Sequence, residues 1–403
     1  MNRLFEKWNL AGRTVKNRLS TLPMEGNDAE PDGRPSQRTI KRYERLSTGG
    51  WGIVYIEAIA PDERGKARPG QLVLTEENLD SFKSLVSRIR AASPDPPLII
   101  FQINHAGRYA LNPTLAYHSE LLDPTWNIPP DMPEATTDEL DAAARACAGA
   151  VRLAAASGAD AADLKCCHGY LAMELLRPAN TRTDKFGGSL KNRLRFLEIL
   201  LDAAQEVSGP HFFFGSRISL LEGFPGGFGS GSKDPLAWDT SELFPLLMTL
   251  MSAGAAFVCG TLGVPYYNPE LVRPWKNYDE KLKVAAMHHR LCAWVKENFP
   301  SLAVISAGYS PLGEASPDTA GENISRGLVD AAGFGRQSFA DPEMPLKLLR
   351  GDTDSINWCK GCKTNNCSFL LRNRVPTGCV IFESFYSLQL KKLKKEQKEK
   401  DDA

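Results

Sequence analysis

Eight short apolar segments, separated by stretches with helical periodicity, constrain the fold of this chain more than any other feature of its sequence. Each segment is six to nine residues long, and polar or glycine residues lie at its end or shortly after it. Near-continuous apolar runs of this length are typical of strands that are buried on both faces of a parallel sheet. We therefore expect strands at residues 18–24, 52–60, 97–104, 159–167, 212–220, 255–261, 303–308 and 329–336.

Helical patterns occupy most of the gaps between these segments. Between residues 79 and 89, apolar side chains recur every three or four positions, which places them on one face of a helix. Thr136 and Glu139 form a candidate capping box ahead of an alanine-rich helix. Further helices are expected at residues 192–207, 241–253 and 279–299, and the gap between the last two strands carries only a weak helical pattern.

Eight strands that alternate with helices predict an α/β fold of the (β/α)8 type, a TIM barrel. In such barrels the catalytic groups lie at the C-terminal ends of the strands. A doubly wound open sheet is the alternative, but it would carry a glycine fingerprint after its first strand, and none follows Met24. We assign residues 1–350 to the barrel and residues 351–403 to a C-terminal extension with four cysteines and a charged tail. We expect the lysine-rich tail from Lys391 to be a solvated, frayed terminus rather than a membrane-surface helix.

Charge and composition narrow the range of partners. The chain has 48 basic and 48 acidic side chains, so it lacks the surplus of cations that nucleic-acid binding requires. It has no apolar run near the ~18 residues of a membrane-spanning helix, and its first residues do not resemble a signal peptide. Nine cysteines are too few for a disulfide scaffold and fit a reducing cytoplasm. We expect a cytoplasmic protein that acts on a small molecule and has no nucleic-acid or membrane partner; homo-oligomer formation is left open.

The fourth expected strand ends in the residues that point most clearly to catalysis. Lys165, His168 and Tyr170 lie within six positions of one another. A tyrosine with an ordinary pKa near ~10 is protonated at neutral pH and can donate a proton. Lysine and histidine can donate hydrogen bonds to a developing oxyanion. Together, the three residues predict a catalytic group at this strand end.

Two further strands contribute polar groups to the same end of the barrel. Arg217 lies within the fifth apolar run, and Gln102 ends the third. A buried guanidinium requires a partner, which is either an anionic or electron-rich ligand or a structural carboxylate such as Glu57. An amide can bond the edge of a heterocycle or be satisfied by neighbouring backbone.

The ends of the last two strands suggest a phosphate site. Gly308 ends the seventh strand, and Gly335 and Arg336 end the eighth. In TIM barrels, the loops after these two strands often bind phosphate through backbone N–H groups, and arginine supplies a forked donor.

The sequence resembles the old yellow enzyme family of FMN-dependent NAD(P)H:flavin oxidoreductases, which includes 2,4-dienoyl-CoA reductase. The resemblance runs from Leu4 to about Phe382 and is most specific at residues 168–171 (HGYL) and 178–189 (PANTRTDKFGGS). Gln102 followed by HAGR at residues 105–108 supports it. The resemblance implies FMN as cofactor and NADH or NADPH as reductant.

Residue roles follow from this resemblance. Tyr170 would protonate the substrate, and His168 would bind its carbonyl oxygen. The implied activity is an ene-reductase, which transfers hydride from reduced flavin to the activated C=C bond of an α,β-unsaturated carbonyl or carboxyl compound. The residues implied to hold FMN are Pro23, Met24, Glu25, Ala58, Gln102, Arg217, Gly308, Gly335 and Arg336.

Two positions depart from the family pattern. Lys165 stands where a second histidine or an asparagine is usual, and Glu25 replaces the small residue usual beside the flavin. Lys165 could stabilise an enolate, select a substrate carboxylate, or pair with Glu25. Two other functions are compatible with the same fold. One is an amine dehydrogenase resembling trimethylamine dehydrogenase, which a cation at the substrate face disfavours. The other is a flavin electron-transfer module without its own substrate.

Four cysteines in the extension are spaced C-x2-C-x4-C-x11-C. The spacing is similar to the [4Fe–4S] site of the dienoyl-CoA reductase branch, although the third cysteine comes one residue later. Zinc and free thiols are the alternatives. An iron–sulfur cluster here would call for an external electron donor protein. The four candidate metal ligands are Cys359, Cys362, Cys367 and Cys379.

Overall fold

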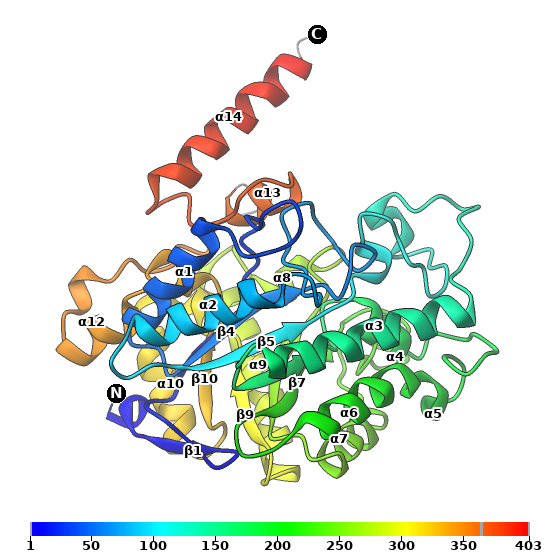
Figure 1. Cartoon of the computed structure of the whole chain (residues 1–403), viewed down its shortest axis with the longest axis horizontal. Coiled ribbons are helices and arrows are strands. Elements are labelled where there is room, and N and C mark those ends of the chain that lie inside the picture. The colour runs from blue at the N-terminus through cyan, green and yellow to red at the C-terminus, as the bar shows by residue number, and fades with distance from the viewer. Residues whose placement is uncertain (1, 363–365, 402–403) are drawn as a thin grey trace.

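The computed structural model describes residues 2–362 and 366–401. At its centre, eight parallel strands form a closed barrel, and helices surround it (Figure 1). This confirms the predicted TIM barrel and excludes the open sheet. The strands are β3 (Leu19–Thr21), β4 (Ile53–Ile59), β5 (Leu98–Ile103), β6 (Ala161–Leu164), β7 (Phe213–Leu221), β8 (Phe257–Leu262), β9 (Ala303–Ser306) and β10 (Ala331–Phe334).

The barrel closes where its last strand meets its first. β10 pairs with β3 in parallel, and Phe334 lies opposite Thr21. An antiparallel hairpin of β1 (Trp8–Leu10) and β2 (Arg13–Val15) precedes β3 and lies at the opposite end of the barrel from the C-terminal helix (Figure 1).

The apolar runs are continuous because alternate side chains of each strand pack into two different cores. In β4, Ile53 and Tyr55 belong to the cluster inside the barrel, whereas Val54 and Ile56 pack against the helices. Both sets are buried, which is the arrangement expected for a strand covered on both faces.

The long helices lie in the expected gaps. Thr136 and Glu139 form the predicted capping box at the start of α3. A helix is also present between β9 and β10, where the sequence pattern was weak. The surrounding helices are α1 (Gln37–Thr48), α2 (Leu79–Ala91), α3 (Thr137–Ala156), α6 (Arg195–Val207), α7 (Leu243–Ser252), α9 (Tyr278–Asn298) and α10 (Ser316–Ser325).

The motif stretch that follows Tyr170 is structural. It contains α4 (Leu171–Leu176) and α5 (Leu190–Arg193). Between them, the fully buried Arg177 makes two hydrogen bonds to the equally buried Glu222, at 2.7 and 2.8 Å. The Asn180 side-chain amide donates to the carbonyls of Leu175 and Phe186. These bonds hold the loop after β6 against the end of β7.

The C-terminal extension returns over the C-terminal ends of the barrel strands. After α11 (Arg336–Ala340) and α12 (Met344–Arg350), the chain crosses the barrel mouth and forms α13 (Cys367–Arg372). The backbone N–H of Cys359 donates to the Gln337 side chain at 2.8 Å, and that of Thr377 donates to the Gly26 carbonyl at 2.7 Å. The extension is therefore tied to the barrel at several points.

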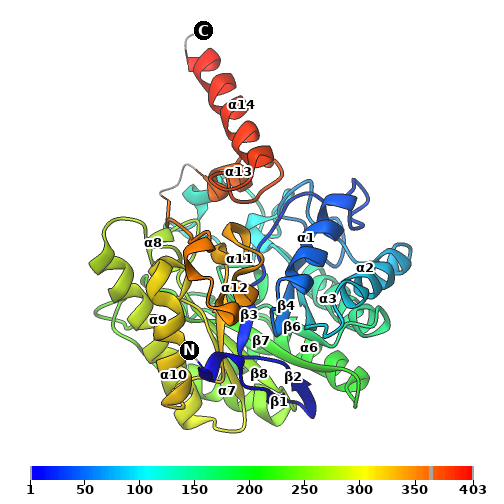
Figure 2. The ribbon, with the colours of Figure 1, turned by 90° about the vertical axis from the view of Figure 1, so that its left-hand side faces the viewer.

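The charged tail is a helix whose described side chains from Lys391 onward are mostly exposed, so the predicted terminus is solvated, but the prediction that it is frayed is wrong over the described residues. α14 (Ser384–Asp401) projects away from the barrel in both views (Figures 1 and 2). Its first turns pack on α13 through Tyr386 and Leu390, and Lys392 lies 3.9 Å from Glu396, one helical turn away. Among the described residues, none of the helices is both long and apolar enough to span a bilayer.

Candidate active site

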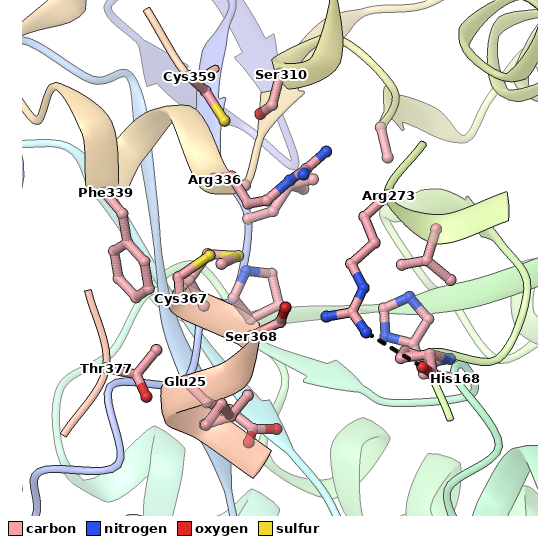
Figure 3. Close-up of a pocket in the computed structure, with 18 of the residues that line it drawn as sticks. Glu25, His168, Arg273, Ser310, Arg336, Phe339, Cys359, Cys367, Ser368 and Thr377 are labelled. Atoms are coloured by element: carbon pink, nitrogen blue, oxygen red, sulfur yellow. Dashed lines mark hydrogen bonds between the residues drawn. The ribbon is translucent and has the colours of Figure 1, made fainter. Parts of the chain in front are cut away.

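A cavity lies at the C-terminal ends of the barrel strands, under the extension (Figure 3). All but one of the residues predicted to bind FMN, substrate or metal contribute to its wall. The exception is Ala58, which is buried in β4 and whose carbonyl accepts a hydrogen bond from the Gln71 side chain at 3.0 Å. The roles of the individual residues stay predictions, but the structure brings nearly all of them together.

Lys165 and His168 follow β6. The Lys165 ammonium lies 3.6 Å from the centre of the Tyr170 ring, and burial lowers the pKa of Lys165 to about 8. His168 has a φ of +61°, its N–H donates to Ser219 Oγ at 3.0 Å, and its Nε2 lies 3.3 Å from Thr261 Oγ1. Burial, followed by the nearby cations, lowers the pKa of His168 well below its usual value, so this imidazole is neutral at pH 7.

Tyr170 belongs to a hydrogen-bonded group of four side chains. Its hydroxyl lies 2.8 Å from that of Tyr266 and donates to Glu25 at 3.3 Å. Arg68 forms an ion pair with Glu25 and donates to the Tyr266 hydroxyl at 2.6 Å. The suggested pairing of Lys165 with Glu25 is therefore wrong: Arg68 reaches the carboxylate, and Lys165 packs on the tyrosine ring instead. Burial raises the pKa of Tyr170 well above its usual value and keeps the phenol protonated.

Arg217 points from β7 into the barrel, where it is buried. Its guanidinium donates to Thr261 Oγ1 at 3.4 Å, and its Nε has no hydrogen-bond partner among the described residues. The alternative of an ion pair with Glu57 is wrong, because Glu57 pairs with Arg42 of α1. Within the described chain, no carboxylate forms an ion pair with Arg217.

Asp163 of β6 organises this part of the wall. One of its carboxylate oxygens accepts from the Arg217 backbone N–H at 2.6 Å, and the other accepts from the Gln102 amide at 2.7 Å. Burial raises the pKa of Asp163 to about 6. These bonds fix the orientation of the Gln102 amide and of the β7 backbone beside it.

Two glycines line the cavity where β9 and β10 end, which is the part expected to bind the FMN phosphate. Gly308 has a φ of +99°, and a Cβ there would lie 2.9 Å from the Cβ of His288. A Cβ on Gly335 would lie 3.2 Å from Met24 Sδ. Arg336 begins α11 beside them and forms no ion pair among residues 2–362 and 366–401. Such an end, with exposed backbone and a free cation, suits a phosphate group.

The site fits FMN on these observations. A buried guanidinium without an anion would be costly in an empty cavity, and an electron-rich ring would satisfy it. At the glycine-lined end, a side chain on Gly308 or Gly335 would press on His288 or Met24, so the close packing of this wall depends on the two glycines. When bound, FMN would be held by Arg217 and Gln102 at one end and by Gly308, Gly335 and Arg336 at the other.

The four cysteines of the extension all line the same cavity. Burial raises the pKa of the Cys367 thiol to about 11. Arg336 opposes this rise, and Cys359 adds to it. Among the described residues, no three His, Cys, Asp or Glu side chains are placed to hold a single metal ion. The geometry therefore gives no support to a mononuclear zinc site.

Sequence reasoning missed several residues of the cavity wall: Arg68, Tyr266, Arg273, His288 and Arg372. Arg68 and Tyr266 lie in loops after β4 and β8, and Arg372 ends α13. Loops carry no periodicity from which their path could be inferred.

Comparison with known proteins defines the class. Residues 3–233 match the NADH:flavin oxidoreductase / NADH oxidase family. An NADH oxidase of Thermoanaerobacter brockii is 26% identical over 400 residues, which cover 96% of this chain and 55% of that protein. The structure of a 2-naphthoyl-CoA reductase aligns with a TM-score of 0.79 and 22% identity over 94% of this chain and 57% of that one. Histamine dehydrogenase from Rhizobium sp. 4-9 aligns with a TM-score of 0.72 and 19% identity over 94% and 52%, respectively.

The closed barrel and the family match together place the chain in the class of flavin-dependent oxidoreductases. The chain belongs to the NADH:flavin oxidoreductase / NADH oxidase family, that of the old yellow enzymes, whose cofactors are FMN and NAD(P)H. This confirms the family inferred from the motifs. The chain spans just over half the length of the relative and of the two solved structures described above.

Proposed function

We propose that this chain is an FMN-dependent NAD(P)H oxidoreductase of the ene-reductase type, which reduces the activated C=C bond of an α,β-unsaturated carbonyl or carboxyl compound. The observation that carries the proposal is the cluster of a protonated Tyr170, a neutral His168 and the Lys165 ammonium at one strand end of the cavity. FMN, when bound, would take a hydride from NADH or NADPH and pass it to the alkene.

The residues of the chain would supply the remaining chemistry. Tyr170 Oη holds a proton at neutral pH and would donate it to the substrate carbon next to the carbonyl. His168 Nε2–H and Lys165 Nζ would stabilise the negative charge that builds up on the carbonyl oxygen. Tyr266, 2.8 Å from the Tyr170 hydroxyl, would orient that hydroxyl and return a proton to it.

Turnover of cyclohexenone with NADPH tests this function. Tyr170→Phe should lower turnover by about 10²- to 10⁴-fold, the usual contribution of a general acid, while reduction of FMN by NADPH alone stays within about twofold. Tyr267→Phe is the matched control, because Tyr267 packs on Phe224 and does not line the cavity. If Tyr170→Phe kept full turnover, the proposed role of Tyr170 would be refuted.

Amine oxidation is the second candidate. The fold is shared with histamine dehydrogenase, but the cavity wall carries Lys165, Arg68 and Arg273, which would repel an ammonium substrate. Oxidation of histamine or trimethylamine with an artificial electron acceptor, in the absence of ene-reduction, would replace the first proposal. Absence of both activities in FMN-loaded protein would favour an electron-transfer module.

We also propose that the four extension cysteines hold a [4Fe–4S] cluster and that an external protein supplies its electrons. All four line one cavity, and their spacing in the sequence is similar to that of a known [4Fe–4S] site. Iron and sulfide analysis of anaerobically purified protein should give about four of each per chain, and Cys379→Ser should reduce both. Iron-free protein with full flavin content would refute this assignment. In this arrangement residues 351–403 act as an extension that completes the barrel site.

A further inference from the structure

The cavity wall has a large excess of positive charge. It contains seven basic side chains, and Glu25 is its one carboxylate among the described residues. Glu25 is already paired with Arg68. FMN would use Arg217 and Arg336, and the cysteine ligands of the proposed cluster would add negative charge near Cys367. Among the described residues, Lys165, Arg273, Lys360 and Arg372 form no ion pair with a carboxylate.

Arg273 is the most constrained of these cations. It follows α8 (Pro269–Val272) in the loop after β8, and its guanidinium points into the cavity beside the His168 ring (Figure 3). Its Nε is buried and lacks a hydrogen-bond partner. The one side-chain hydrogen bond of Arg273 within the described residues is a long one, 3.5 Å from Nη2 to the Pro265 carbonyl.

Neighbouring positive charges make it less favourable for Arg273 to be charged in the cavity wall. Arg372 donates to the same Pro265 carbonyl, at 3.3 Å, so two cations converge on one oxygen. Burial, followed by Arg372 and Arg336, lowers the pKa of Arg273 to about 10, and the neighbours that oppose this effect, Cys367 and Tyr266, are not carboxylates. Like charges brought together without a counter-ion destabilise a fold, whereas an anion between them would be bound strongly.

Arg273 comes from a different loop than the expected phosphate end of FMN, although Arg336 of that end is near enough to lower its pKa. That end is formed by the loops after β9 and β10, whereas Arg273 comes from the loop after β8. In Figure 3, Arg273 lies beside His168, and Arg336 lies between it and the sulfur of Cys359. A group bound to Arg273 would therefore be next to the atoms that His168 is expected to bind.

We propose that Arg273, assisted by Arg372 at the rim, forms an anion-binding subsite that selects ligands carrying an oxyanion group. This deepens the proposed function, on which it rests: the alkene substrate would be an unsaturated compound with a carboxylate or phosphate group. The same chemistry could be provided by the phosphates of the nicotinamide reductant, and the experiment separates the two sources.

Calorimetric titration of the FMN-loaded enzyme with benzoate and with benzamide tests the subsite, because these ligands have nearly the same shape and differ in charge. The wild-type protein should bind benzoate more tightly. Arg273→Gln should weaken benzoate by about tenfold or more, the usual effect of losing a charge-assisted hydrogen bond, and change benzamide less than twofold. Arg372→Gln should have a smaller effect, because Arg372 is exposed.

Two controls accompany this titration. Arg350→Gln removes an exposed arginine outside the cavity and should change neither affinity. Arg273→Lys keeps the charge without the fork and should recover part of the benzoate affinity, and circular dichroism verifies that each variant is folded.

The outcomes divide clearly. A loss confined to benzoate assigns the subsite to the substrate, and a loss confined to NADPH, measured with the same variants, assigns it to the phosphates of the reductant. Equal losses for benzoate and benzamide, unchanged affinity for both benzoate and NADPH, or lower FMN content in Arg273→Gln would overturn the proposal. Failure of the proposed function would appear differently, as absent turnover with an intact preference for benzoate.

Discussion

The buried ion pair between Arg177 and Glu222 predicts a specific pattern of stability. Both side chains are 0% exposed, and two hydrogen bonds of 2.7 and 2.8 Å join them. Glu222 also accepts from the Phe228 backbone N–H at 3.0 Å. Arg177→Met would leave a buried carboxylate without its cation, which costs about 3–5 kcal/mol of unfolding free energy. Glu222→Leu would strand a buried guanidinium and should cost about as much.

The double variant should recover most of this loss. Replacing both partners of a buried ion pair with apolar residues of similar size is often neutral or stabilising, and the remaining cost is the orphaned Phe228 N–H, about 1 kcal/mol. With an unfolding entropy of about 2.1 cal/mol/K per residue, the 403-residue chain should lose about 4–6 °C of Tm in each single variant. In the double variant the loss should be about 1 °C.

Thermal unfolding followed by circular dichroism, with urea unfolding as a second measure, provides the assay. FMN content is held constant across the four proteins, because bound cofactor would itself raise Tm. If the double variant were as unstable as the sum of the single variants, the energy would lie in separate packing contacts, and the argument from a coupled charge pair would be refuted.

Two further predictions concern the cavity itself. Gly308→Ala should abolish FMN retention after desalting and lower the free energy of unfolding, because the added Cβ would meet His288. Gly327 is the control: it also has a positive φ but has open space around it, so Gly327→Ala should lose only about 1 kcal/mol of unfolding free energy and keep FMN. Equal behaviour of the two variants would contradict this prediction. Lys165 has a folded-state pKa of about 8 against 10.5 in the unfolded chain, so between these values the unfolded state binds more protons and stability rises with pH, by about 1.4 kcal/mol per unit. In flavin-free protein, urea midpoints measured from pH 8 to 10 should therefore rise more in the wild type than in Lys165→Met, and parallel curves would show that Lys165 is not the titrating group.

The barrel could be predicted from the sequence because each strand is buried on both faces. Ile53 to Ile56 illustrate this: alternate residues enter different cores, yet all are apolar, and the run is visible without knowledge of its neighbours. Arg217 and Tyr170 were found for a related reason, since polar groups at the ends of such runs are conspicuous.

The partners of these groups could not be predicted. The register of β4 shifts between Ile56 and Ala58, and Glu57, at this irregularity, bonds to Arg42 and Tyr43 of α1 instead of Arg217. A bulge of this kind has no signature in the sequence. Arg68, which displaces Lys165 from Glu25, lies 43 residues from that carboxylate in a loop, and only the folded path of the loop brings them together.

The seam at which β10 joins β3 has a consequence for biosynthesis. The glycine at 335 lies beside Met24, more than three hundred positions earlier in the chain. A nascent polypeptide cannot assemble this corner until residue 335 has left the ribosome, so capture of the prosthetic group would follow synthesis of all eight barrel strands. Bound flavin would contact residues from both the first and the last strand of the barrel. Separation of β3 from β10 and release of the flavin would therefore be coupled.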